Sequence, residues 1–133
     1  MQSDMVWDPL RKKSVALTPE ERVRQWFIGV LSMGLKVPEH MMMSEVSLKV
    51  GEKPYRADIV VYGRDGKPLM VVECKRNDVT LDQSVVDQAL RYNTSLGVRY
   101  ITITNGEKTF IFQRKDDGFE FMEKAPVWEE MIK

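Results

Sequence analysis

The chain has 133 residues, of which 43% are apolar and 30% charged, a balance typical of one folded domain that closes its own core. A single cysteine and a single histidine exclude an internal disulfide, a four-cysteine zinc site and a His-rich metal site, so any metal would be held mainly by oxygen. Twenty basic and twenty acidic residues cancel, so only a local patch could attract a nucleic acid.

The first residues carry no clear period. We expect residues 1–17 to form an irregular N-terminal arm and residues 18–133 to form a single domain. The start MQSDMVWDPLRKK lacks the apolar stretch of a signal peptide, and no segment approaches the roughly 20 apolar residues of a membrane span. This predicts a cytoplasmic protein without a membrane partner. Arg11, Lys12 and Lys13 are either phosphate contacts or part of a solvated surface.

A helix is predicted to begin at Thr18. Thr18 is the N-cap, Pro19 takes the first helical position, and Glu21 follows three residues after the cap, which is a capping box. Arg22 and Arg24 on this helix are again either phosphate contacts or a solvated face. Apolar residues recur at helical spacing and predict a buried stripe of Val23, Trp26, Phe27, Val30 and Leu31.

The rest of the chain alternates strands with helices. A second helix is predicted over residues 81–96, with Thr80 and Gln83 as its capping box and Gly97 as its stop. A short helix is expected in the tail PVWEEMIK. Alternating or β-branched runs predict strands at residues 44–50, 55–62, 68–75, 98–105, 109–114 and 118–123. This order predicts an α/β fold with a mixed central β-sheet flanked by α-helices.

Two carboxylates interrupt the apolar strands of the stretch YRADIVVYGRDGKPLMVVECKR. If Asp65-Gly66 is a two-residue type I′ turn, Asp58 lies directly opposite Glu73. Alternation then places Arg56, Asp58, Val60, Val71, Glu73 and Lys75 on one face of the hairpin. The opposite, apolar face would contain Ala57, Ile59, Val61, Met70, Val72 and Cys74.

Opposed carboxylates on neighbouring strands repel one another, so a cation is needed to offset them. Lys75 lies two residues from Glu73 on the same predicted face, and a divalent cation bound by both carboxylates would complete the neutralisation. Two alternatives stay open. The hairpin could face solvent with its charges in an ordinary ion-pair cluster, or a longer loop could shift the register and separate the carboxylates.

The second helix supplies an independent pair of polar residues. Its predicted inward stripe is Leu81, Val85, Ala89, Tyr92 and Leu96. Gln88 precedes Tyr92 by four residues, so the two side chains point together towards the edge of the sheet. The alternative is a buried glutamine that the backbone satisfies.

On these residues the sequence resembles the PD-(D/E)xK nuclease superfamily and, within it, the N-terminal domain of type I restriction enzyme R subunits. The resemblance runs from Thr18 to Phe112 and implies a restriction-endonuclease-like core. It is carried by PEERVRQ, by RADIVVY with Asp58, by VVECKR with Glu73 and Lys75, by QALRY, and by the segment Thr102 to Gly106.

The resemblance implies a role for each matching residue. Asp58 and Glu73 would bind Mg²⁺, with Mn²⁺ as a possible substitute, and the Cys74 carbonyl would be a further ligand. Lys75 would position or deprotonate the attacking water and stabilise charge on the phosphate. Gln88 would complete the catalytic group by orienting the site.

Tyr92 and Arg76 would contact the nucleic acid. The implied activity is Mg²⁺-dependent hydrolysis of DNA, as an endonuclease-like component of a restriction or defence system with protein partner subunits. The alternative is a catalytically silent module of the same fold that binds nucleic acid or protein.

A carboxylate from the first helix often completes such a site; Glu20 and Glu21 are both candidates, between which the sequence does not decide, and Glu45 is a third acid. Glu21 fits the capping box, and Glu45 lies on the polar side of its strand and is expected to face solvent. Ala57 stands where the superfamily name has proline, a position that is not a ligand. Because the chain contains no G-x-x-x-x-G-K-[ST] motif, it is either a stand-alone relative or a fragment.

Overall fold

A six-stranded mixed sheet forms the centre of the computed structural model, which describes residues 4–50 and 52–133. The strands follow chain order across the sheet, and only β5 and β6 pair in parallel. Their bounds are β3 (Met42–Val50), β4 (Lys53–Tyr62), β5 (Pro68–Cys74), β6 (Tyr100–Thr104), β7 (Thr109–Lys115) and β8 (Gly118–Met122). The predicted α/β fold with a mixed central sheet is confirmed.

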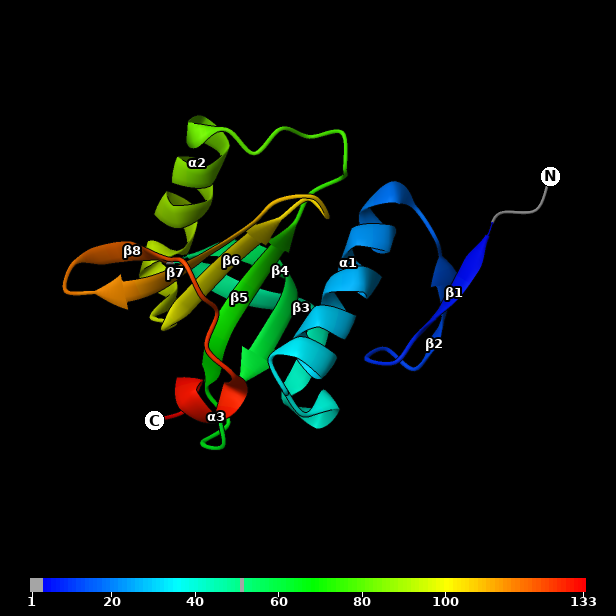
Figure 1. Ribbon diagram of the computed structural model, residues 1–133, viewed down its shortest axis with the longest axis horizontal. Helices are drawn as coiled ribbons and strands as arrows, with labels where there is room; N and C mark the ends of the chain where they lie inside the picture. The colour runs from blue at the N-terminus through cyan, green and yellow to red at the C-terminus, as the bar shows by residue number, and fades with distance from the viewer. Residues whose placement is uncertain (1–3, 51) are drawn as a thin grey trace.

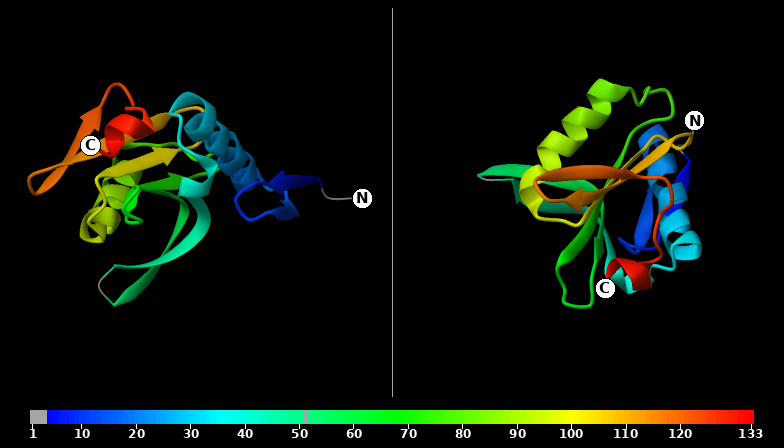
Figure 2. Two further views of the ribbon diagram at one scale, coloured as in Figure 1. Left: turned by 90° about the horizontal axis from the view of Figure 1, so that it is seen from below. Right: turned by 60° about the vertical axis from the view of Figure 1, so that its left-hand side comes forward.

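Helices cover both faces of this sheet (Figures 1 and 2). Helix α1 (Pro19–Gly29) continues into a π-helical turn (Val30–Gly34) on one face, and α2 (Gln83–Asn93), followed by a 3₁₀ turn (Thr94–Leu96), lies on the other. A short 3₁₀ turn (Glu39–Met41) precedes β3, and α3 (Trp128–Met131) is the last helix of the described residues. In the part of the chain that the structure describes, no helix has the length and apolar character needed to cross a membrane.

Helix α1 packs its apolar side on the sheet. Val23, Phe27 and Leu31 are buried as predicted, because they recur on one side of the helix and meet β4 and β5. Trp26 was placed in the same stripe and is 47% exposed, so that prediction is wrong. Arg24 takes part of the buried side instead, three residues before Phe27.

The N-terminal residues form a hairpin rather than an irregular arm. Strands β1 (Met5–Asp8) and β2 (Lys13–Ala16) pair antiparallel, and the hairpin lies beside α1 at the opposite end of the molecule from β8 (Figure 1). Residues 1–3 of the expected arm lie outside the described residues. The four-residue strands are too short to show a period in the sequence, and Asp8, a polar residue, is fully buried.

The turn between β4 and β5 differs from the predicted one, although the register beyond it is correct. Ile59, Val60 and Val61 face Val72, Val71 and Met70, as expected. The loop spans residues 63–67, however, and Lys67 N–H donates to Asp65 Oδ1 at 3.0 Å, which competes with a two-residue type I′ turn. A bulge between Val61 and Tyr62 absorbs the change of loop length and restores the register.

Helix α2 begins two residues later than predicted and is rotated. Asp82, not Thr80, is the N-cap, because its carboxylate accepts the Val85 N–H at 3.0 Å. Gly97, at φ +71°, ends the following 3₁₀ turn as expected. The buried residues of this helix are Val86, Ala89 and Asn93. The predicted stripe is therefore about one residue off, and Tyr92 lies at the edge of the buried side of the helix.

Candidate functional site

The candidate site begins where the β4–β5 ladder ends. The last pair is Ile59 with Val72, and beyond it the Cys74 amide N–H donates to Asp58 Oδ2 at 2.7 Å. The Asp58 carboxylate therefore takes the place that a backbone carbonyl would hold in a continuing ladder. This contact fixes Asp58 beside the backbone that joins Glu73 to Lys75.

The neighbouring strand is distorted at the same level. In the β3–β4 register, Ser44 faces Ile59 and Val46 faces Ala57, but Glu45 and Asp58 between them are not paired. Glu45 has φ +52°, a left-handed conformation that is uncommon for a residue with a side chain. The distortion interrupts the regular alternation of β4.

This interruption corrects the predicted faces of the hairpin. Tyr55 and Ala57 pack with Val60 and Val71 on the α2 face, whereas Ile59 packs on the α1 face. Asp58 turns towards Arg24 of α1, so it does not share a face with Glu73 and Lys75 as predicted. The spacing of apolar residues in β4 does not predict this break in the alternation of faces. The left-handed residue that causes it, Glu45, lies on the neighbouring strand β3.

The environment of Asp58 changes its proton affinity. Burial raises the pKa of the Asp58 carboxyl from 3.8 to about 6, and the carboxylates of Glu20 and Glu73 also raise it. The Cys74 N–H and Arg24 act in the opposite direction and lower the pKa. A largely buried carboxyl with neighbouring carboxylates is typical of a functional site.

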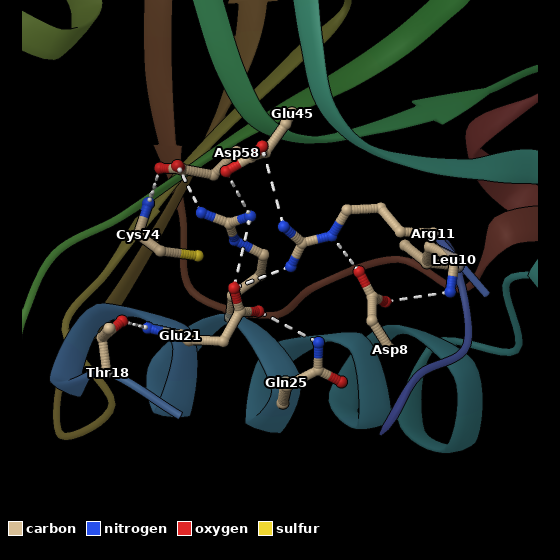
Figure 3. Close-up of polar contacts among 10 residues, drawn as sticks. Asp8, Leu10, Arg11, Thr18, Glu21, Gln25, Glu45, Asp58 and Cys74 are labelled. Carbon is tan, nitrogen blue, oxygen red and sulfur yellow. Dashed lines mark hydrogen bonds and ion pairs between the residues drawn. The ribbon is translucent and has the colours of Figure 1, made fainter. Parts of the chain in front are cut away.

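Two arginines and four carboxylates form a network on the α1 side, which we call the arginine network (Figure 3). Arg11 binds Asp8, Glu21 at 2.7 Å and Glu45 at 3.6 Å. Arg24 lies 3.1 Å from Glu45 and 3.5 Å from Asp58. The network joins the β1–β2 hairpin, α1, β3 and β4.

The arginine network overturns three predictions. Arg11 and Arg24 are engaged by carboxylates instead of being open to a phosphate, and Arg24 is only 5% exposed. Glu45 was expected to face solvent, but it is half-buried and paired with both arginines. Sequence reasoning missed the network because its members come from four separate elements and Asp8 lies in a segment without a period.

The α2 side of the site is open. Glu73 and Lys75 lie on this face, 4.0 Å apart, as their spacing predicted. They line a cavity of about 330 Å³ together with Tyr55, Val79, Val85, Gln88, Ala89 and Tyr92. The residues that were predicted to act with Glu73 from the second helix are therefore brought to the same cavity.

Gln88 and Tyr92 reach this cavity from the exposed edge of α2. Tyr92 is 41% exposed, and its ring lies 4.9 Å from the ring of Tyr55, which the sequence reasoning did not single out. Gln88 is exposed, so the alternative of a buried, backbone-satisfied glutamine is wrong. Arg76 is also exposed and pairs with Asp78 at 3.3 Å, outside the cavity.

Cys74 points away from the cavity. Its side chain is buried among the apolar residues under α1, and burial raises the pKa of the thiol. Only its backbone carbonyl is a reasonable ligand, as the resemblance implied.

The loop after β5 is held by two asparagines that the sequence reasoning missed. Asn77 Nδ2 donates to the Asn105 carbonyl at 2.7 Å, and Asn105 Nδ2 donates to the Val79 carbonyl at 2.8 Å. Gly106 has φ +90°, and a Cβ there would lie 2.6 Å from Asn77 Nδ2, so glycine is required. The segment TNG was the only signal of this brace in the sequence.

The three acids proposed to complete a metal site differ in burial and in ion pairing. Glu21 is buried and bound to Arg11 and Gln25, and Glu45 is paired with the arginines. Glu20 is exposed at the start of α1, and its charge raises the pKa of Asp58. Of the three, Glu20 is the one whose carboxylate forms no ion pair with another described residue.

Asp58 and Glu73 are the candidate ligands for a hard divalent cation. Over residues 4–50 and 52–133, no three Asp, Glu, His or Cys side chains converge closely enough to form a metal cage. Mg²⁺ is usually bound by one or two carboxylates together with water and substrate phosphates. Asp58 and Glu73, on either side of the Cys74 backbone, suit that mode of binding.

Comparison with protein families agrees with this geometry. The model of the family described as type I restriction enzyme R protein N terminus (HSDR_N) matches residues 19–126. The chain belongs to this family. The matched residues contain α1, the whole central sheet and α2, and the hairpin β1–β2 precedes the match.

Solved structures resemble the domain in fold. A candidate nuclease belonging to DUF820 from Anabaena variabilis has a TM-score of 0.54 at 13% identity, covering 91% of this chain and 86% of its own. The type IIG restriction endonuclease BpuSI has a TM-score of 0.52 at 19% identity over 86% of this chain. The match covers 15% of the BpuSI chain. These likenesses show a restriction-endonuclease-like nuclease fold, and comparison with curated proteins gives no significant match.

Proposed function

We propose that this chain hydrolyses phosphodiester bonds of DNA with the help of Mg²⁺. The proposal rests on the meeting of Asp58 with the Glu73–Lys75 segment where the β4–β5 ladder ends, in a chain of this family. The Cys74 amide holds one oxygen of Asp58, and the Cys74 residue itself joins the acid to the lysine. Glu73 and Lys75 flank the Cys74 backbone, and the Cys74 N–H ties Asp58 of β4 to the same segment.

Each residue has a separate task in the proposed reaction. Asp58 and Glu73, with Glu20 from α1, would hold Mg²⁺, for which Mn²⁺ would substitute. The bound ion would supply a water of lowered pKa and positive charge beside a phosphoryl oxygen. Lys75 is partly exposed at the cavity and would offer its ammonium to the attacking water or to the phosphate, because a compact point charge suits both.

Gln88 and Tyr92 would act from the other wall of the cavity. Both reach it from α2, where Gln88 can hydrogen-bond the water or a phosphate and the exposed ring of Tyr92 can contact a sugar or base. Arg76, exposed beyond Lys75, would bind the backbone of the DNA. The domain would act in the cytoplasm with partner subunits of a restriction or defence complex.

Cleavage of plasmid DNA by the purified chain tests the proposal. We expect nicking or linearisation with Mg²⁺ or Mn²⁺, no reaction in EDTA, and loss of activity in Asp58→Ala and in Lys75→Ala. Asp65→Ala and Lys67→Ala are matched controls, because both residues lie in the exposed turn at the far end of the same hairpin. Metal-dependent cleavage that persists in both site variants would exclude this site.

The same variants identify a silent module. A domain that binds DNA with equal affinity in Mg²⁺ and EDTA, and that cleaves under neither condition, would be the non-catalytic alternative. Calorimetric Mg²⁺ binding that disappears in Glu73→Ala would favour the enzyme.

A further inference from the structure

Arg24 is a buried cation that contacts three carboxylates. Its guanidinium lies 3.1 Å from Glu45, 3.5 Å from Asp58 and 3.7 Å from Glu21. These acids belong to β3, β4 and α1, so a single side chain connects three elements directly beside Asp58. The exposed Arg22 on the same helix has one distant partner, Asp4 at 4.0 Å.

The two oxygens of Asp58 are held by different groups. Oδ2 accepts the Cys74 N–H at 2.7 Å, and Oδ1 lies beside Arg24 Nη2. A carboxylate held at both oxygens cannot rotate freely about its Cβ–Cγ bond. Loss of the guanidinium would leave Oδ1 without the one ion-pair partner that the described residues supply to it.

The geometry of Arg24 is not the one that stability alone would favour. Its Nε and Nη1 are buried and make no hydrogen bond of acceptable geometry, although Nη1 approaches Glu45. Buried polar atoms without partners are rare and costly. The left-handed Glu45 adds backbone strain at the same place, and strain of this kind concentrates at functional sites.

We propose that Arg24 is a positioning residue for the metal site: it fixes the orientation of the Asp58 carboxylate and thereby sets the affinity for a divalent cation. This inference rests on the proposed function. Groups that orient a metal ligand without touching the metal typically change metal affinity by about 10–100-fold when they are removed. Glu45 and Glu21 hold Arg24 in place and are not themselves ligands.

The simplest competing interpretation predicts that metal affinity changes in the opposite direction when Arg24 is removed. If Arg24 only competes with the metal for Asp58, its removal would strengthen metal binding, because a positive charge would leave the site. The direction of the change in affinity therefore separates a positioning residue from a competing counter-ion.

Mn²⁺ binding measured by electron paramagnetic resonance tests the inference without any activity assay. We expect Arg24→Gln to weaken Mn²⁺ binding by about 10–100-fold while Arg22→Gln, on the same helix, leaves the dissociation constant unchanged. Circular dichroism at the same protein concentration shows whether each variant is folded. Equal or tighter Mn²⁺ binding by folded Arg24→Gln would overturn the inference.

Arg24→Lys decides the matter if Arg24→Gln does not fold. Lysine keeps the charge, but its ammonium cannot bridge three carboxylates as the planar guanidinium does. Weaker Mn²⁺ binding by a folded Arg24→Lys supports positioning, and parental affinity overturns it. If the parent chain itself binds no Mn²⁺, the proposed function and this inference fail together; if it binds Mn²⁺ and the Arg24 variants match it, only the inference fails.

Discussion

The charged side chains on the two sides of the sheet differ in burial and in pairing. On the α1 side, the arginine network is largely buried and every acid in it has a recorded ion-pair partner. On the α2 side, Glu73 and Lys75 are partly exposed, 4.0 Å apart, and line an open cavity. The ion pairs on the α1 side therefore fix the position of the site, whereas the cavity on the α2 side leaves room for a ligand.

Removal of one acid from each side should expose this difference most strongly. We expect Glu21→Ala to lower the free energy of unfolding by about 3–5 kcal/mol, because it leaves the buried guanidinium of Arg24 and the half-buried guanidinium of Arg11 short of a partner. Glu73→Ala should change it by less than about 1 kcal/mol, since its pair with Lys75 is long and solvated. Urea denaturation at pH 7.5 measures both. Equal losses in the two variants would remove the distinction between the two sides.

The pH dependence of stability should isolate Asp58. Burial raises its folded pKa to about 6, above its ordinary value of 3.8, so its contribution to stability is complete below pH 3.8 and is lost as the pH rises through 6. Asp58→Asn should therefore be about 1–3 kcal/mol more stable than the parent chain at pH 8, and the gap should close near pH 4.

Asp82→Asn is the control for this experiment. The Val85 N–H lowers the pKa of Asp82, so its contribution is present above pH 3.8 and is lost as the pH falls. The two variants should thus diverge from the parent in opposite pH directions. A gap for Asp58→Asn that is constant from pH 4 to pH 8 would contradict the assigned burial.

Substitution of Glu45 separates backbone strain from charge. Alanine and glycine both remove the carboxylate, but glycine accepts φ +52° without a Cβ penalty. We expect Glu45→Gly to be more stable than Glu45→Ala by about 1 kcal/mol, the reverse of the usual order in a strand. Thermal denaturation of the pair measures the difference. The usual order, with alanine more stable, would mean that β3 changes conformation when the carboxylate is lost.

The smallest effect is expected at Arg76. Its pair with Asp78 is on the surface, so Arg76→Ala should change the free energy of unfolding by less than about 0.5 kcal/mol. Affinity for a DNA duplex, measured by fluorescence anisotropy at low salt, should nevertheless fall if Arg76 contacts a phosphate. Arg64→Ala, at the far end of the hairpin, should leave DNA affinity unchanged. Equal affinities of the two variants would remove Arg76 from the interface.

Local chemistry in the sequence predicted most of the elements. Thr18 caps α1 as expected, with the Glu21 N–H donating to its hydroxyl at 3.1 Å. The Glu21 side chain does not complete the capping box, since Arg11 and Gln25 bind it instead. Strands β3 to β8 appear within a few residues of their predicted bounds, because β-branched runs and turn residues mark them locally.

The candidate site was predictable only in part. The spacing of Glu73 and Lys75, and of Gln88 and Tyr92, follows from the period of a strand and of a helix, and the structure brings all four to one cavity. The orientation of Asp58 did not follow, because an unpaired, left-handed Glu45 on the neighbouring strand breaks the alternation. The role of Arg24 as a buried partner of acids was also out of reach.

The sequence by itself determined the order of strands β3 to β8 and their helices, the Thr18 cap of α1 and the family, since each depends on residues close together in the chain or on a motif. The tertiary structure alone decided which carboxylates meet which cations. Asp58 of β4 and Glu45 of β3 meet Arg24 of α1, and these contacts depend on how α1 packs on the sheet. Long-range packing, rather than local propensity, sets the burial and charge environment of the site.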